Sequence, residues 1–227
     1  GETRQSLTVN EATTGKQFRF MLPGPVWGEA ERARVFTLLR ATARPGGLSV
    51  ISGSQPPGVP VDFPAQLAAS MPETRVVLDT SGSTLTEAVR HPIPGLEVLR
   101  MDGPEGEELA GKPLPTLADT AGYAQSLVRA GVARTVIIAR GAEGNVLADT
   151  DQKLFARAAK VRVESTVGAG DSFVAAFVLA LSRGQSNAEA LAMGSAAASA
   201  AVMTDATQLC RPEDVMRLLP ECAVTPV

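Results

Sequence analysis

The sequence predicts an α/β fold with a mainly parallel sheet flanked by helices. Short β-rich runs alternate with helical segments through the middle of the chain, and two long alanine-rich helical segments follow. Two alternating apolar runs near the N-terminus flank a polar turn, which predicts a small β hairpin. The chain has 227 residues, of which 44% are hydrophobic, so it can bury a sizeable core.

The hairpin is expected between Ser6 and Leu22, where residues 12–15 form the turn and Pro23-Gly24-Pro25 ends the unit. A helix is expected over Glu29–Thr42, because apolar residues recur there at helical spacing with charges between them. Alternating strands and helices follow at Leu48–Ser52, Phe63–Ser70, Arg75–Asp79, Thr84–Arg90, Leu96–Arg100, Leu117–Ala130 and Thr135–Ile138.

After Gly144 the pattern indicates two short antiparallel strands and then two long helices with many small residues. A polar loop and a short last helix, which begins at Pro212, complete the chain. These segments are Asn145–Ala148, Leu154–Ala156, Ala169–Ser182, Asn187–Val202 and Thr204–Leu209.

The overall charge argues against several classes of partner. The net charge is −3 and the basic residues are scattered, so no electrostatic footprint for nucleic acid or an anionic membrane is visible. No apolar run approaches the ~18 residues that a membrane span requires, and no basic-then-apolar leader opens the chain. We expect a cytoplasmic protein with Cys210 and Cys222 as reduced thiols and His91 at the surface.

The most informative stretch is STVGAGDSF at residues 165–173, directly before an apolar helix. Glycines at a helix start leave the first backbone N–H groups open to an anion such as phosphate. Asp171 in the first turn could accept a proton from an attacking hydroxyl. The alternative is a turn whose acid only complements the helix dipole. Neither a dinucleotide fingerprint nor a P-loop is present.

This stretch resembles the second signature of the ribokinase-like sugar kinases, the pfkB-type carbohydrate kinases. Residues 3–5 and 15–21 look like lid strands of the minor-type 6-phosphofructokinases, and residues 51–59 resemble their sugar-phosphate loop. Residues 206–210 are similar to the tail of that subgroup. Together these segments favour this subgroup over fructose-1-phosphate or tagatose-phosphate kinases.

The resemblance implies a role for each matching residue. Asp171 would be the catalytic base, and Gly168, Ala169 and Gly170 would form the anion hole. The sugar phosphate would meet Arg4, Gly53 and Ser54. The nucleotide would meet Arg100, Asp102, Gly141, Gly144, Ser195 and Ser199. Glu108 is a candidate magnesium ligand, and a monovalent cation would meet Val161, Ser165 and Val167.

Several of these residues have a plain structural alternative. Arg4 could be a solvated charge near the chain end, and Ser54 a turn former before two prolines. Ser195 and Ser199 could be small packing residues in an alanine-rich helix.

Three departures from the family pattern stand out. Arg100-Met101-Asp102 replaces Lys-Pro-Asn and precedes an apparently longer acidic segment, which would alter magnesium handling. Ala139 replaces a serine of the nucleotide loop. The loop near Thr204–Gln208 lacks the usual asparagine, glycine and arginine, which argues against potassium activation.

The family also has an N-terminal segment that supplies a first strand, two lid strands and an aspartate for the sugar hydroxyls. Nothing like it precedes Gly1, so we expect the working protein to have residues that this sequence lacks; a degenerate relative is the alternative. The chain is then expected to comprise a partial lid hairpin at residues 1–24 and the kinase domain at residues 25–227.

The leading hypothesis is magnesium-dependent transfer of the ATP γ-phosphate to fructose 6-phosphate. One alternative is a non-catalytic module that binds nucleotide or sugar phosphate. Another is a kinase for tagatose 6-phosphate, fructose 1-phosphate or a nucleoside. Pairing through the lid strands is expected to give a homodimer.

Overall fold

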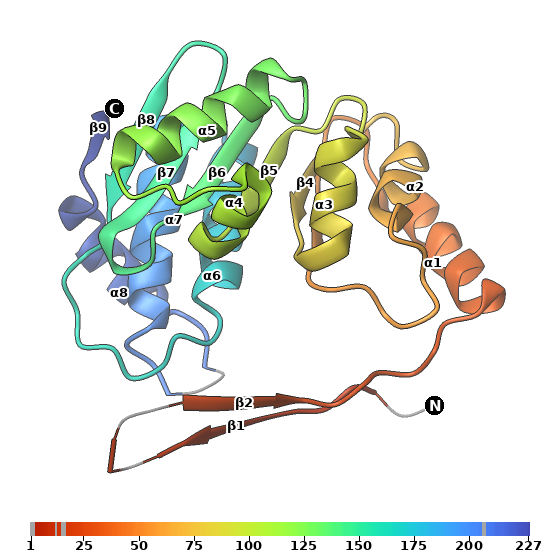
Figure 1. The fold of residues 1–227 in the computed structure, drawn as a ribbon, viewed down its shortest axis with the longest axis horizontal. Coiled ribbons are helices and arrows are strands. Elements are labelled where there is room, and N and C mark those ends of the chain that lie inside the picture. Colours follow the sequence, from red (N-terminus) through yellow and green to blue (C-terminus); the bar gives the residue numbers. More distant parts are fainter. Residues whose placement is uncertain (1–2, 12, 15–16, 206–207) are drawn as a thin grey trace.

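In the computed structural model, the described residues are 3–11, 13–14, 17–205 and 208–227. Seven strands form one sheet in the order in which they follow each other along the chain (Figure 1). The first four pair in parallel and the last three are antiparallel, as the sequence predicts for all but the final strand. They are β3 (Leu48–Ser52), β4 (Arg75–Asp79), β5 (Val98–Met101), β6 (Thr135–Ala139), β7 (Gly144–Ala148), β8 (Lys153–Arg157) and β9 (Val224–Pro226).

Helices cover both faces of this sheet, so the α/β prediction is confirmed. In Figure 1, α3 to α5 lie in front of the strands, whereas α6 and α7 lie behind them. The helices are α1 (Glu29–Thr42), α2 (Phe63–Ala69), α3 (Gly82–Arg90), α4 (Gly103–Ala110), α5 (Leu117–Arg129), α6 (Ala169–Ser182), α7 (Asn187–Ala201) and α8 (Pro212–Leu218).

The hydrophobic core has a part on each face of the sheet, because successive side chains of a strand point to opposite faces. In β4, Val76 and Leu78 join the apolar cluster under α2, α3 and α5, while Val77 joins the cluster under α6 and α7. All three side chains are buried, because a parallel strand with helices on both faces has no solvent side. A third cluster packs α8 against α7 through Val215, Leu218 and Ala197.

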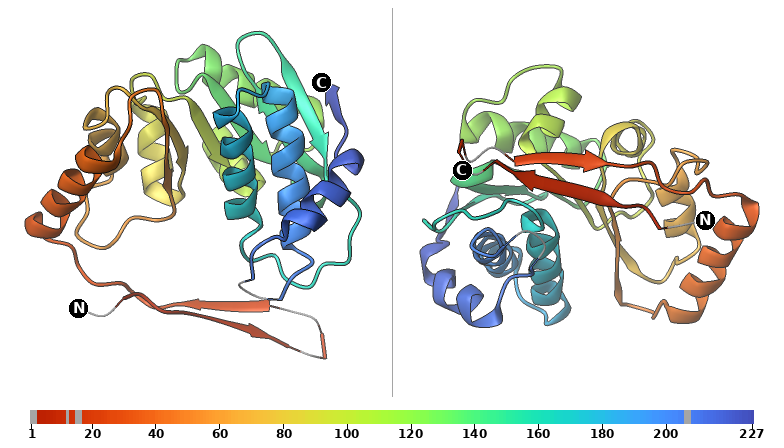
Figure 2. Two further views of the ribbon diagram at one scale, coloured as in Figure 1. Left: turned by 180° about the vertical axis from the view of Figure 1, so that it is seen from behind. Right: turned by 90° about the horizontal axis from the view of Figure 1, so that it is seen from below.

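The hairpin stands apart from this body. Strands β1 (Ser6–Asn10) and β2 (Gln17–Met21) pair antiparallel with each other in a separate two-stranded sheet, which confirms the prediction. Figure 2 shows it extending beside the carboxyl-end loops of the parallel strands. Part of its predicted turn, and residues 206–207 of the predicted polar loop, lie outside the described residues.

Two elements differ from the sequence prediction. Residues 103–108, the apparently longer acidic segment for which no helix was predicted, belong to helix α4, which a capping box between Asp102 and Glu105 initiates. Strand β9 was not predicted; it adds to the edge of β8 through pairs such as Phe155 with Thr225. None of the described helices has the length and apolar character needed to cross a membrane.

Candidate active site

The carboxyl ends of the parallel strands bring polar side chains together, as expected for an open α/β sheet. Asp79 is the last residue of β4, which lies between β3 and β5 in the sheet. Its Oδ1 accepts a hydrogen bond from Nη1 of Arg100 on β5 at 3.2 Å, and its Oδ2 lies 3.5 Å from the Ser52 hydroxyl on β3. The Arg100 and Asp79 side chains are only 16% and 12% exposed, so this ion pair is largely shielded from water.

Helix α6 begins beside this ion pair. Gly168 is its N-cap in the left-handed conformation, and no side chain caps the helix. The Ala169 N–H donates to the Thr166 carbonyl at 3.5 Å. The first-turn N–H groups after it face no capping side chain and are available to an anion, and the helix dipole favours negative charge there. The guanidinium of Arg100 packs against the same turn, because a Cβ on Gly170 would lie 3.1 Å from Nη1. Asp171, also in the first turn, is exposed.

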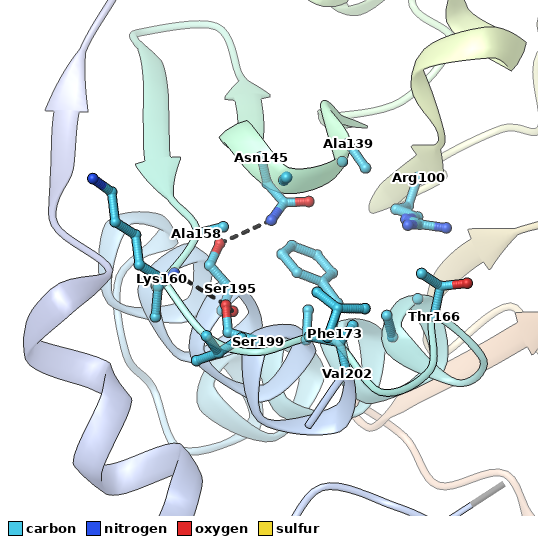
Figure 3. A pocket seen from close by; sticks show the side chains of 18 residues that line it. Arg100, Ala139, Asn145, Ala158, Lys160, Thr166, Phe173, Ser195, Ser199 and Val202 are labelled. Atoms are coloured by element: carbon cyan, nitrogen blue, oxygen red, sulfur yellow. Dashed lines mark hydrogen bonds between the residues drawn. The ribbon is translucent and has the colours of Figure 1, made fainter. Parts of the chain in front are cut away.

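A cavity of about 630 Å³ opens from this helix start (Figure 3). Its volume is in the range typical of small-molecule sites. The lining includes seven predicted site residues, namely Arg100, Gly141, Val161, Ala169, Gly170, Ser195 and Ser199. It does not include Arg4, Gly53, Ser54, Asp102, Glu108, Gly144, Ser165, Val167, Gly168 or Asp171.

The end of the cavity away from Arg100 is built by α7, strand β7 and the loop that follows β8. Ser195 accepts a buried hydrogen bond from Asn145 Nδ2 at 3.0 Å. The Ser199 hydroxyl accepts from the Ala159 backbone N–H at 3.1 Å and donates to the Ser195 carbonyl at 2.9 Å. Both serines therefore tie α7 to the sheet, and their hydroxyls shape this end of the cavity while bonded within the protein.

The two predicted nucleotide-loop glycines have different roles in the structure. Gly141 lies in a short 3-10 turn after β6 and lines the cavity. Gly144 begins β7 at φ 138°, and a Cβ there would collide with the carbonyl oxygen of Ala156 on the paired strand. Gly144 is thus required by the close approach of β7 and β8.

The acidic residues after β5 form a compact arrangement at the start of α4. Asp102 Oδ1 accepts from the Glu105 N–H at 2.9 Å, and Glu105 Oε2 accepts from the Asp102 N–H at 2.8 Å. Burial raises the pKa of Glu105, although the Asp102 N–H opposes that shift, and Asp102, Arg100 and Asp79 also contribute. Glu108, the predicted magnesium ligand, is exposed one turn farther along α4.

The predicted sugar-phosphate residues come together although 50 positions separate them. Arg4 Nη1 donates to Ser54 Oγ at 3.0 Å, and Nη2 lies 3.1 Å from Met21 Sδ on β2. Ser54 follows Gly53 directly after β3, so this contact joins the hairpin stem to the carboxyl edge of the sheet. Both side chains are exposed and accessible to a ligand.

The predicted monovalent-cation residues lie on the loop between β8 and α6. Ser165 is 2% exposed, and its Oγ accepts from the Val167 N–H at 3.2 Å. The backbone N–H groups of Glu164 and Ser165 donate to the Val202 carbonyl at the end of α7. Among the described residues, no cluster of three or more His, Cys, Asp or Glu could hold a metal ion alone.

Sequence reasoning missed several residues of this site. Asn145, Lys160 and Phe173 line the cavity, and Lys160 lies at the end away from Arg100 (Figure 3). Their roles depend on strand pairing and helix packing, which no local pattern signals. For Glu105 a signal did exist, because Asp-x-x-Glu at a helix start is the pattern of a capping box.

Known proteins similar in sequence to this chain are carbohydrate kinases. Residues 1–214 match the family model described as pfkB family carbohydrate kinase. The chain is 36% identical over 226 residues to ATP-dependent 6-phosphofructokinase isozyme 2 of Mycobacterium tuberculosis, covering 99% of this chain and 65% of that enzyme. It is 34% identical to the Escherichia coli isozyme 2, covering 95% and 70%. The 1-phosphofructokinase of Xanthomonas campestris is also 34% identical, with coverages of 97% and 68%.

Solved structures with the same fold include two sugar kinases. Phosphofructokinase-2 from Escherichia coli in complex with potassium superposes with a TM-score of 0.88 at 32% identity, over 97% of this chain and 71% of that one. Ribokinase of Arabidopsis thaliana complexed with ribose and ATP gives a TM-score of 0.70 at 19% identity, a likeness in fold alone. The chain therefore spans about two thirds of the length of the proteins it matches.

Proposed function

The chain belongs to the pfkB family of carbohydrate kinases, and from that premise we propose that it transfers the γ-phosphate of ATP to the C1 hydroxyl of fructose 6-phosphate. The observation that carries the proposal is the uncapped start of α6, which meets the Arg100 guanidinium at the mouth of a cavity of about 630 Å³. Open amides, a helix dipole and a fixed cation are the groups that stabilise a transferring phosphoryl.

The nucleotide would occupy this cavity. Its phosphates would meet Arg100 and the Gly170 amide, and its base would lie between the apolar walls near Val202 and Ala198. The buried Asn145–Ser195 hydrogen bond would keep that end rigid before the nucleotide arrives. A preformed site loses less side-chain entropy when its ligand binds.

Asp171 is proposed as the general base. Its carboxylate would accept the proton of the C1 hydroxyl while that oxygen forms a bond to the γ-phosphorus. The bond from this phosphorus to the bridging oxygen breaks at the same time, and ADP leaves with the bridging oxygen. The exposed position of Asp171 in the first turn of α6 leaves it accessible to a substrate hydroxyl.

The residues present fit a magnesium ion. Magnesium takes one or two carboxylates together with phosphate oxygens, rather than a complete protein cage. The Glu105 carboxylate lies close enough to Asp102, Arg100 and Asp79 for their charges to act on it, so Glu105 or its neighbour Asp102 could contribute. When bound, the ion would neutralise charge on the transferred phosphate.

The acceptor's own phosphate would bind at Arg4 and Ser54. Their contact places a guanidinium and a hydroxyl at one point of the carboxyl edge of the sheet. Both groups can donate to phosphate oxygens, and a guanidinium can do so with two N–H groups. This subsite supports a substrate that is already phosphorylated. Tagatose 6-phosphate and fructose 1-phosphate remain the alternative substrates.

A phosphorus NMR assay with magnesium, ATP and each sugar phosphate tests the reaction. In the whole protein that contains this chain, we expect fructose 1,6-bisphosphate from the parent and none from Asp171→Asn. Asp214→Asn is the matched control, because Asp214 holds the same third position of α8, and it should leave turnover unchanged. Equal turnover by Asp171→Asn would contradict the proposal.

A second candidate function is nucleotide binding without catalysis. It is favoured by Asp102, which stands where the family pattern has an asparagine and which is engaged with Glu105 in a capping box. Saturable ATP binding by calorimetry, together with no product from any sugar phosphate, would support this reading over the kinase.

The apolar hairpin supports self-association. Leu7, Phe20 and Leu22 are 62%, 56% and 57% exposed, which is unusual for large apolar side chains on a small sheet. A tetrameric inhibited form has been solved for phosphofructokinase-2 of Escherichia coli. We propose that this chain forms a homodimer through β1 and β2; light scattering that gives only monomer would contradict it.

A further inference from the structure

A second cavity, of about 420 Å³, lies on the side of α6 and α7 that faces α8. The left view of Figure 2, which looks from behind, shows these three helices packed together in front of the sheet. Most of its wall is apolar and comes from a single face of α6, from α7 and from α8. The apolar residues are Ala175, Ala176, Leu179, Ala180, Met193, Ala197, Pro212, Val215 and Met216, and Cys210 adds a thiol.

One buried polar group on this wall has no partner. Ser172 is 4% exposed, and its Oγ makes no hydrogen bond within the described part of the chain. An unpaired buried hydroxyl is costly for the folded state, and most such groups in proteins are satisfied. A ligand oxygen that reaches Ser172 would remove this cost.

The opposite end of the same helix face carries a positive charge. Ser172 and Arg183 are 11 positions apart, which corresponds to about 16 Å along a helix. Arg183 is the charged residue among the described residues of the wall, it is exposed, and no ion pair engages it there. The cavity therefore has a mainly apolar wall, with a hydroxyl at one end of the α6 face and a cation, together with the Gln185 amide, toward the other.

We propose that this cavity is a second small-molecule site, for an elongated apolar acid that carries a hydrogen-bonding group at its far end. The carboxylate would bind Arg183, the methylene chain would lie along Ala176, Leu179 and Met193, and the distal group would reach Ser172. This site is separate from the cavity of Figure 3, because the two share no lining residue. It does not depend on which sugar phosphate is the substrate.

Methionine side chains allow the site to be located directly. Met193 and Met216 line this cavity, whereas Met71 and Met101 are buried in the cluster on the other face of the sheet. With methionine methyl groups labelled with carbon-13, 10-hydroxydecanoate should shift the Met193 and Met216 signals and leave those of Met71 and Met101 in place. Saturating ADP should not abolish these shifts. Shifts of equal size at all four methionines, or none, would overturn the proposal.

Two substitutions, at Arg183 and at Ser172, test the two ends of the cavity. Arg183→Gln should weaken 10-hydroxydecanoate about tenfold, the effect of losing one charge-assisted hydrogen bond. Arg129→Gln, which changes a basic residue in the last turn of α5, is the matched control and should bind as the parent chain does. Decanoate lacks the distal hydroxyl, so the parent chain should bind it more weakly than 10-hydroxydecanoate. The Ser172→Ala variant should bind the two ligands with equal affinity. If Arg183→Gln and Ser172→Ala both bind 10-hydroxydecanoate with the affinity of the parent chain, the proposed position of the ligand between these two residues is wrong.

Discussion

Arg100 Nη1 lies 3.2 Å from Asp79 Oδ1, and this contact joins the carboxyl ends of two neighbouring parallel strands. The pair also fixes the guanidinium against Gly170 at the start of α6. Arg100 Nε is buried and has no hydrogen-bond partner in the described residues, so Asp79 is important for balancing this charge.

Asp79→Ala should therefore destabilise the protein by about 3 kcal/mol, because it leaves a largely buried guanidinium unpaired. Asp79→Ala combined with Arg100→Met should be more stable than Asp79→Ala alone. Urea unfolding measures both. The control is Glu164→Ala at the exposed pair with Arg162, where the loss should be within about 1 kcal/mol. A double variant less stable than Asp79→Ala would show that the pair does not behave as a unit.

Ser54→Ala should raise the KM for the sugar phosphate about tenfold, through loss of one hydrogen bond to a charged group. The hydroxyl is exposed and contacts Arg4, so the free energy of unfolding should change by no more than about 0.5 kcal/mol. Steady-state kinetics and urea unfolding separate the two effects. Ser126→Ala on α5 is the control and should alter neither quantity. An unchanged KM for Ser54→Ala would remove Ser54 from the proposed subsite.

Gly194→Ala should destabilise the packing of α6 against α7. A Cβ at this position would lie 2.8 Å from the buried ring of Phe173 and 3.1 Å from its carbonyl oxygen. Overpacking of this kind costs about 1–3 kcal/mol. Gly122→Ala in α5 is matched, because nothing lies within 4 Å of its Cβ, and it should stabilise by up to about 1 kcal/mol. Thermal unfolding should move the two variants in opposite directions.

Glu105 should make stability depend on pH. Burial raises its pKa above the ordinary value of 4.5, so the folded state holds this proton to higher pH than the unfolded chain. The stability that the proton contributes is complete below pH 4.5 and is lost as pH rises through the raised pKa. Glu105→Gln keeps an acceptor for the Asp102 N–H but cannot ionise, so it should gain stability relative to the parent chain across that interval. Urea unfolding at several pH values would contradict this if the difference stayed constant or fell.

Local patterns predicted most of the fold. Strand β4 and helix α6 have the predicted bounds because a buried apolar run and a glycine-rich start are both local signals. Strand β5 begins at Val98 rather than Leu96, since residues 93–96 form a turn before the ladder starts. Strand β9 could not be found in this way, because three residues become a strand only when the edge of β8 is present.

The site was predictable to a smaller extent. The STVGAGDSF stretch predicted the glycine-rich, uncapped start of α6 because all of its groups are close in sequence. Arg100 and Gly170 were each named, but the packing of one against the other requires β5 and α6 to meet across the sheet. Asn145 depends on a hydrogen bond to Ser195, 50 positions away. Such contacts arise from tertiary structure and leave no pattern in a single sequence.

The order of the strands in the seven-stranded sheet has a consequence for folding. Each strand from β4 to β9 pairs with the strand that immediately precedes it in the chain. During synthesis from the N-terminus, every new strand of this sheet therefore meets an edge that already exists, and none has to insert between two strands formed earlier. The sheet can grow by successive additions at one moving edge, so a pause at any point leaves a shorter sheet with the same arrangement.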